Sequence, residues 1–429
     1  MDGEAVEGGA QPAGPETNPQ TNPVTGPAAG TLPRLGRPGR LDAYGTTVFA
    51  HFSARAAEVG AINLGQGFPD ESGPPEVLEA AERAIRNGHN QYAPGRGVPA
   101  LLEAVAAHSR SFYGQEIDPD REVLVTAGAT EAIAATMLAL CEPGDEVVTF
   151  EPYYDSYAAT IELAGARRRV VPLRPPGWQF DPDELRRAIT PRTRAVLLNT
   201  PHNPTGRVFG HAELELVAEL CRQHDLVAVT DEVYEHLVFE EPGTPRHERL
   251  ATFDGMAERT VTISSAGKTF SVTGWKIGWA IAPAPLISSI MAVKQFLTFT
   301  SGTPLQHAVA VGLELPPERL AQLAGTLRLR RDELCDGLEE LGWTVLRPQA
   351  TYFATVDVRP LGYGDGHRFC DDLVTRAGVA AIPTVVFYDD EHKEAARHLV
   401  RFAFCKRAAV ISEALGRLAD WSAGRTGAG

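Results

Sequence analysis

Cysteine is scarce in this chain of 429 residues, and its five cysteines are scattered. They form no C-x-x-C pair and show no cysteine and histidine spacing of a zinc site, so the sequence indicates neither a disulfide framework nor a metal centre. Hydrophobic runs are short, and none approaches the roughly 18 residues of a membrane span. We therefore expect a cytoplasmic protein that has no membrane-spanning segment.

Basic residues are also fewer than acidic ones. The chain has 40 Lys and Arg residues and 55 Asp and Glu residues, which gives a formal net charge of -15. Nucleic acids and anionic membrane surfaces attract basic patches, so neither is an expected partner. The 43% of hydrophobic residues can fill large cores. The composition favours a globular protein that acts on small molecules.

The first 40 residues contain no aromatic side chain, and 15 of them are glycine or proline. Such a composition cannot bury enough apolar surface to fold, so we expect residues 1–39 to form a disordered tail without a catalytic role. Acidic residues at positions 2, 4 and 7 and the lack of an apolar core argue against a signal or transit peptide.

From residue 73 to 309, short β-branched runs alternate with helical stretches. This pattern predicts βαβ units, and hence an α/β fold with a mainly parallel central sheet and helices on both faces. After residue 310, long amphipathic helices and short strands indicate a smaller α+β domain. We expect three folded parts: an arm of residues 40–72 that packs with the small domain, a large domain of residues 73–309, and a small domain of residues 310–429.

Two motifs that suggest other functions are weak. Residues 95–100, "GRGVPA", match a loose dinucleotide-binding pattern, but no strand precedes them. Residues 211–224 combine histidines and glutamates without HExxH spacing, and they read as an amphipathic helix. We therefore expect neither a dinucleotide site nor a metal site.

Two lysines, Lys268 and Lys276, lie in the run "TISSAGKTFSVTGWKIGW" between apolar residues. Burying an unpaired ammonium group costs several kcal/mol or more, so each lysine needs a partner. Several predicted strands end in polar clusters, and ligands of open α/β sheets bind at that edge. The partners of the two lysines are therefore expected at the strand ends.

One such strand end offers an anion site. Gly128, Ala129 and Thr130 follow a predicted strand where a helix begins, so their N–H groups and the helix dipole favour a phosphate. Ser265 can add a hydroxyl, and Lys276 a positive charge.

The polar and aromatic side chains at the other strand ends are suited to bind an aromatic ring. Asp231 can hold a protonated pyridine nitrogen, Asn203 and Tyr234 can hydrogen-bond a phenolic oxygen, and Tyr154 can stack on the ring face. Lys268 can then be neutralised as an imine, so the two lysines meet the two ends of pyridoxal phosphate. Each residue alone also has an ordinary structural explanation, such as a turn, a helix cap or packing. Only their combination favours the cofactor.

Six segments of the chain carry a resemblance to a known family: "NLGQGFPD", "EPYYDSY", "NTPHNPTG", "TDEVYEHLVF", "SSAGKTFSVTGWKIGW" and "HLVRFAFCK". In order, from about residue 40 to 420, they resemble the fold-type I, class I and II aminotransferases. The resemblance is strongest to the branch of kynurenine (glutamine) aminotransferases and N-succinyldiaminopimelate aminotransferases. It implies a pyridoxal phosphate enzyme that moves an amino group from an L-amino acid to a 2-oxo acid, with 2-oxoglutarate expected.

The resemblance also implies roles for single residues. Lys268 would be the Schiff-base lysine, with Asp231 and Tyr234 as further catalytic residues. Arg401 would bind the substrate carboxylate. The residues that would hold the cofactor are Gly128, Ala129, Thr130, Tyr154, Asn203, Asp231, Tyr234, Ser265, Lys268, Lys276 and Tyr92. The residues implied around the substrate are Arg401, Asn203, Gly67, Phe49 and Thr300.

The family builds its site across a homodimer, so the resemblance places Tyr92 and Thr300 in the neighbouring subunit's site. A pyridoxal phosphate lyase that breaks a carbon–sulfur or similar Cβ bond would use most of the same residues, and it stays open as an alternative. A non-catalytic sensor would need an effector domain that the tail does not provide. The amino donor is also open; N-succinyldiaminopimelate, methionine, glutamine and aromatic amino acids are the candidates. Tyr44, Phe68 and Tyr388 are expected to influence that choice.

Overall fold

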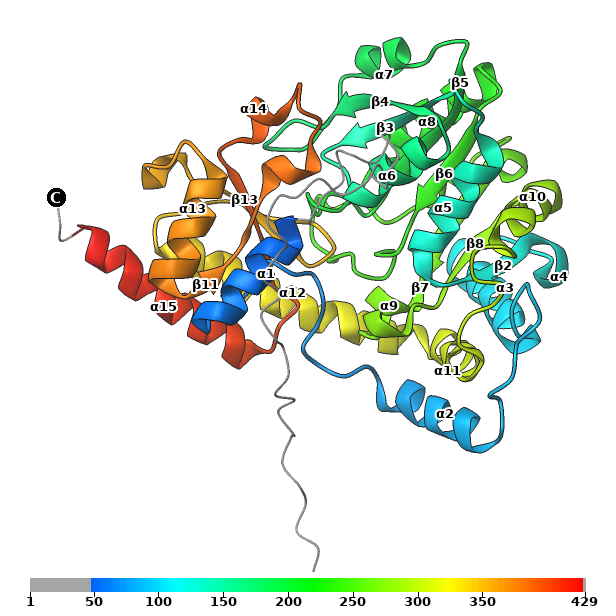
Figure 1. The fold of residues 1–429 in the computed structure, drawn as a ribbon, viewed down its shortest axis with the longest axis horizontal. Helices are drawn as coiled ribbons and strands as arrows, with labels where there is room; N and C mark the ends of the chain where they lie inside the picture. Colours follow the sequence, from blue (N-terminus) through cyan, green and yellow to red (C-terminus); the bar gives the residue numbers. More distant parts are fainter. Residues whose placement is uncertain (1–47, 427–429) are drawn as a thin grey trace, which may run out of the picture. The chain divides into compact units, whose positions relative to one another are not determined.

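The computed structural model describes residues 48–426 of the chain. The predicted disordered tail, residues 40–47 of the predicted arm and Tyr44 lie outside the described residues. In the described part, helices pack around a large central sheet to form an α/β layer structure (Figure 1). All five cysteines are buried and none forms a disulfide. Among residues 48–426, no helix combines the length and apolar character needed to cross a membrane.

The central sheet has seven strands, and all but one run in the same direction. Strand β8 is the exception, since it pairs antiparallel with both of its neighbours. In spatial order the strands are β2 (Val123–Thr126), β8 (Gly278–Ile281), β7 (Thr260–Ser265), β6 (Val227–Asp231), β5 (Thr193–Asn199), β3 (Glu146–Glu151) and β4 (Arg167–Pro172).

Helices cover both faces of this sheet, which explains why strands such as β3 are buried on both sides, whereas the edge strand β4 is largely exposed or half-buried. Val147 and Val148 are neighbours in β3, yet they belong to different buried clusters on opposite faces. The helices around the sheet are α2 (Pro75–Arg86), α3 (Pro99–Tyr113), α4 (Pro119–Glu122), α5 (Gly128–Leu140), α6 (Asp155–Leu163), α7 (Pro182–Ala188), α8 (His211–Gln223), α9 (Ala266–Thr269), α10 (Ala284–Lys294) and α11 (Thr303–Leu313).

The C-terminal part contains a second, four-stranded antiparallel sheet, in the order β12-β13-β10-β9. Its strands are β9 (Thr344–Leu346), β10 (Phe353–Asp357), β12 (Ile382–Pro383) and β13 (Leu399–Ala403). The accompanying helices are the long α12 (Pro317–Glu340), α13 (Gly366–Asp372), α14 (Lys393–Ala396) and α15 (Ala408–Thr426). Strand β13 is central in this sheet, so its side chains are buried throughout.

The N-terminal described segment lies with this C-terminal part. Helix α1 (Val48–Val59) contacts β11 (Val379–Ala380) and β12, and β1 (Ile62–Asn63) pairs in parallel with β11. Figure 1 shows α1, in blue, beside the orange and red elements. We propose that residues 48–72, the described part of the predicted arm, form one domain with residues 310–426, and that residues 73–309 form the other.

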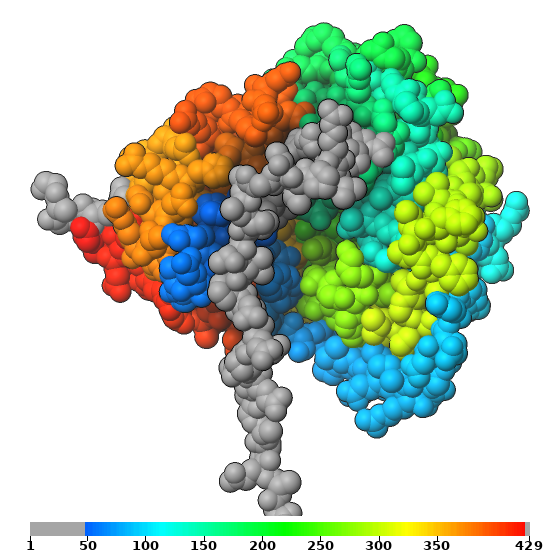
Figure 2. Space-filling model, viewed as in Figure 1, coloured from blue at the N-terminus to red at the C-terminus, as the bar shows by residue number. Residues whose placement is uncertain are grey.

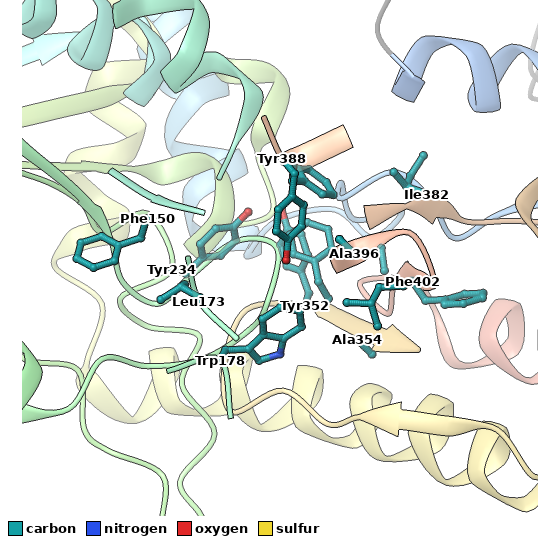
Figure 3. Close-up of a cluster of buried hydrophobic side chains, with 14 of the residues drawn as sticks. Phe150, Leu173, Trp178, Tyr234, Tyr352, Ala354, Ile382, Tyr388, Ala396 and Phe402 are labelled. Atoms are coloured by element: carbon teal, nitrogen blue, oxygen red, sulfur yellow. The ribbon is translucent and has the colours of Figure 1, made fainter. Parts of the chain in front are cut away.

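One buried apolar cluster runs from the large sheet to the small one. It includes Phe150 and Leu173 on one side and Ala354 and Phe402 on the other, with Tyr352 between them (Figure 3). In Figure 2 the orange and red C-terminal residues lie on one side of the molecule and the green residues of the large sheet on the other. The predicted α/β class, with a mainly parallel sheet and helices on both faces, is confirmed. The reversed direction of β8 was not predicted.

Candidate active site

A cavity of about 450 Å³ lies at the carboxyl ends of the central strands. Most of the residues singled out in the sequence line it, although they come from distant segments. They are Phe49, Gly67, Gly128, Ala129, Thr130, Tyr154, Asn203, Asp231, Tyr234, Ser265, Lys268, Lys276 and Arg401.

Lys268 reaches this cavity from α9, the short helix that follows β7. Burial lowers the pKa of its amine to about 8, against an ordinary value of 10.5. The amine lies 5.9 Å from the ring centroid of Tyr234 and 5.7 Å from that of Tyr352. A lysine in these surroundings loses its proton more readily than a surface lysine, and a neutral amine is both a base and a nucleophile.

Asp231 is the last residue of β6 and is 4% exposed. Its carboxylate accepts a hydrogen bond of 2.6 Å from the Tyr157 hydroxyl and one of 3.3 Å from the Val233 N–H. Burial raises its pKa to about 6, although the Tyr157 hydrogen bond acts in the opposite direction. A buried carboxylate that faces a cavity can stabilise a cationic group there.

The start of α5 forms one end of the cavity. Gly128 has φ +73°, a backbone conformation that other residues rarely adopt. A Cβ at Gly278 would lie 2.6 Å from the Gly128 carbonyl carbon, so β8 can approach the helix start only because this residue is glycine. The Lys276 amine lies 3.4 Å from the Thr130 hydroxyl. Backbone N–H groups, a hydroxyl and an ammonium group therefore converge, as an anion such as a phosphate requires.

Arg401 forms the opposite side of the cavity. It is 2% exposed, and its guanidinium donates to the Asn203 side-chain oxygen at 3.0 Å and to the Gly65 carbonyl at 3.1 Å. The Phe353 ring lies against it, 3.9 Å from the centroid. Its Nε has no hydrogen-bond partner, and no acidic side chain among residues 48–426 forms an ion pair with it. Burial lowers its pKa to about 10. This buried cation has room for an anion from the cavity.

Two of the residues implied by the resemblance do not line this cavity. Tyr92 is 84% exposed and packs edge-on against Phe299, with ring centroids 5.6 Å apart. The Thr300 hydroxyl is buried without a hydrogen-bond partner. A site in the neighbouring subunit, which the sequence predicted for both residues, stays a prediction.

The sequence reasoning missed several cavity residues. Tyr157 lies in the quoted segment "EPYYDSY", three residues after Tyr154, but only the fold brings it to Asp231. Asn199 donates to the Asp231 backbone carbonyl at 2.8 Å and accepts from the Asn203 N–H at 2.7 Å. Its place at the end of a predicted strand was a usable signal. Phe353 gave no such signal, because its contact with Arg401 joins two strands of the small sheet.

The fold and this cavity define a class of protein, the fold-type I aminotransferases. The sequence model of the family "aminotransferase class I and II" matches residues 59–418, and the chain belongs to this family. The predicted family and the predicted amino-transferring activity are confirmed, so this protein is an enzyme.

The chain is also similar to individual aminotransferases of this family. The chain is 54% identical over 387 residues to a probable N-succinyldiaminopimelate aminotransferase of Mycobacterium tuberculosis, covering 88% of this chain and 97% of the relative. A solved structure of N-succinyldiaminopimelate aminotransferase from Mycobacterium tuberculosis matches with a TM-score of 0.87 and 53% identity, over 90% of this chain and 100% of that one. A methionine aminotransferase of Escherichia coli is 41% identical over 381 residues, covering 88% of this chain and 97% of the relative.

The lowered pKa of Lys268 predicts how the stability of the cofactor-free protein depends on pH. The folded state releases this proton at about pH 8, whereas the unfolded chain holds it to 10.5. Between these values the unfolded state binds more protons, so the contribution of Lys268 to stability is lowest below pH 8 and rises up to pH 10.5. Relative to Lys268→Met, the wild-type free energy of unfolding should rise by about 1–3 kcal/mol across this window. Denaturant unfolding of both proteins at pH 7.5 and 10 measures this, and a constant difference would contradict it.

Proposed function

We propose that this enzyme binds pyridoxal 5'-phosphate in the cavity and transfers the amino group of N-succinyl-LL-diaminopimelate to 2-oxoglutarate. The observation that carries the substrate side is Arg401, a buried guanidinium without an ion pair among the described residues, which lines the same cavity as Lys268. A guanidinium binds a carboxylate through two parallel hydrogen bonds, which suits the α-carboxylate of an amino acid.

The donor set of the cavity supports the cofactor. The start of α5, Ser265 and Lys276 would bind its phosphate, and Asp231 would hold the proton on its ring nitrogen. Asn203 and Tyr234 would hydrogen-bond its phenolic oxygen, with Tyr154 on the ring face. When bound, pyridoxal phosphate supplies an aldehyde and an electron-withdrawing ring that stabilises negative charge on the substrate Cα.

The protein's own residues would do the rest. Lys268 would hold the cofactor covalently in the resting enzyme. With its amine free, it would take the proton from the substrate Cα and deliver it to the carbon of the cofactor's aldehyde group. Tyr157 and the Val233 N–H would keep the Asp231 carboxylate oriented. Arg401 would fix the substrate so that its Cα faces Lys268.

A second cavity adjoins the first, and both basic and acidic side chains line it. About 1350 Å³ in volume, it shares Phe49 and Asp155 with the first cavity. Arg169 and Arg187 line it, and both are exposed, with no ion pair among residues 48–426. The far end of N-succinyl-LL-diaminopimelate carries two carboxylates, which these arginines could bind. The relatives at 53–54% identity favour that donor over methionine, and Arg169 and Arg187 offer positive charge for its far end.

A panel of amino donors with 2-oxoglutarate tests this function. We expect kcat/KM for N-succinyl-LL-diaminopimelate to exceed the values for methionine, glutamine and kynurenine by about tenfold or more, the scale that one well-placed charged contact commonly provides. The product assay should detect glutamate. An equal or higher value for methionine would contradict the proposed donor. Release of ammonia from cysteine-type substrates, without glutamate, would indicate the lyase.

Replacement of Arg401 tests the carboxylate site. Lysine keeps the charge but loses the planar fork, so Arg401→Lys should lower kcat/KM by roughly 10² while the cofactor spectrum stays unchanged. The control is Arg359→Lys, since Arg359 is an exposed arginine that lines neither cavity and pairs with Asp357 at 2.6 Å. It should keep wild-type kinetics. If Arg401→Lys lost stability but kept its kinetics, Arg401 would be a structural residue.

We further propose a homodimer with shared sites. Tyr92, Phe296, Leu297 and Phe299 expose between 47% and 84% of their surfaces, an unusual gathering of large apolar side chains. A second copy that covers them would also bring Tyr92 and Thr300 to its own cavity. Sedimentation of the wild type should show dimers, and Phe296→Glu should weaken them. A fully active wild-type monomer would contradict this assembly.

A further inference from the structure

Arg249 is a fully buried cation in a cluster of charged groups that does not line the cavity. Its guanidinium lies 3.2 Å from a Glu232 oxygen and 2.8 Å from a Glu235 oxygen, and it donates to the Ser109 hydroxyl at 2.8 Å. The Tyr113 ring lies 3.8 Å from its central carbon. We call Ser109, Tyr113, Glu232, Glu235 and Arg249 the Arg249 cluster.

The two glutamates of this cluster belong to the segment that carries two cavity residues. Along "DEVYE", residues 231–235, Asp231 and Tyr234 line the cavity, whereas Glu232 and Glu235 contact Arg249. Each glutamate directly follows a cavity residue in the chain, so a shift of either glutamate must move its cavity neighbour with it. The segment is thus held from the side opposite to the cavity.

The cluster also reaches β7. Glu235 accepts a 2.6 Å hydrogen bond from the Ser264 hydroxyl and another of 2.6 Å from Tyr113. Ser264 directly precedes Ser265, and α9 with Lys268 follows. The Arg249 cluster therefore ties the end of β6, which carries Asp231, to the end of β7, which leads to Lys268.

Two carboxylates buried together repel each other unless a cation compensates them. Burial acts to raise the pKa of Glu235, but Arg249, His236, His108 and the Ser264 hydrogen bond together hold that pKa well below its ordinary value. Glu232, Glu235 and His247 are also close enough to suit a metal ion. In this structure the Arg249 guanidinium already binds both of these carboxylates, and the His247 ring nitrogen pairs with Glu232 at 3.0 Å. The arrangement favours an internal ion cluster over a metal site.

We infer that Arg249 is a positioning residue, which holds Asp231 and Tyr234 in place through Glu232 and Glu235. The inference rests on the proposed function, since it gives Asp231 and Tyr234 their roles toward pyridoxal phosphate. Arg249 itself does not touch the cavity. The planar, charged guanidinium of Arg249 fixes the turn after β6. That turn then fixes the positions of Asp231 and Tyr234 in the cavity.

The test compares two buried arginines. Arg249→Lys keeps the charge but cannot bind both glutamates and Ser109 together. Arg331→Lys is the matched control, because Arg331 is 2% exposed, pairs with Glu241 and Asp332, and lies 4.8 Å from the Phe239 ring centroid. Both variants should lower Tm. Only Arg249→Lys should release pyridoxal phosphate from the full-length holoenzyme faster, by about tenfold, and shift the pH at which the absorbance of the bound cofactor changes.

A second pair of variants, with smaller changes, tests the inference if Arg249→Lys does not fold. Ser264→Ala removes the hydroxyl that links β7 to Glu235, whereas Thr262→Val on the same strand removes a buried hydroxyl without a hydrogen-bond partner. Ser264→Ala should speed cofactor release about threefold, and Thr262→Val should leave it unchanged. Equal release from the members of each pair would overturn the inference but leave the proposed function intact. A wild-type protein that binds no pyridoxal phosphate would overturn both.

Discussion

Parallel pairing of β5, β6 and β7 is the constraint on which the rest of the site depends. Asn199 pairs with Asp231, and Asp231 with Ile263, so these strands end along one edge of the sheet. Each chain segment must then turn away, and the turn exposes polar groups that the strands themselves could not carry. Lys268, in α9 directly after β7, and Asp231, at the end of β6, line one cavity because the register aligns the ends of these two strands.

Burial of charge gives this edge its chemistry. Desolvation moves the pKa of Lys268 down and that of Asp231 up, so both groups titrate closer to neutrality than on a surface. Three buried arginines differ in the charge of the groups that they bind. Arg249 and Arg331 each bind two carboxylates, whereas Arg401 binds only neutral oxygen atoms. Among residues 48–426, Arg401 thus forms no ion pair although it is buried beside a cavity, and such a cation suits an anionic ligand there.

The sequence could predict what is local. A run of apolar residues followed by a polar cluster marks a buried strand and its end, so Asp231, Asn203 and Lys268 could be found without a structure. Tyr157 could not be selected over its neighbours, because its role depends on a contact with Asp231 across 74 residues of chain. The reversed strand β8 escaped for a similar reason, since an apolar run has no direction until its neighbours are known.

We propose above all that Lys268 holds pyridoxal phosphate covalently, while Lys276 pairs with its phosphate. Borohydride reduction of the yellow holoenzyme makes the lysine–cofactor bond permanent, and peptide mapping by mass spectrometry then locates it. The account predicts a single modified peptide with the label on Lys268, and no label in a Lys268→Ala variant. A label on Lys276 would exchange the two lysines, and a wild-type protein without any trapped cofactor would contradict the claim.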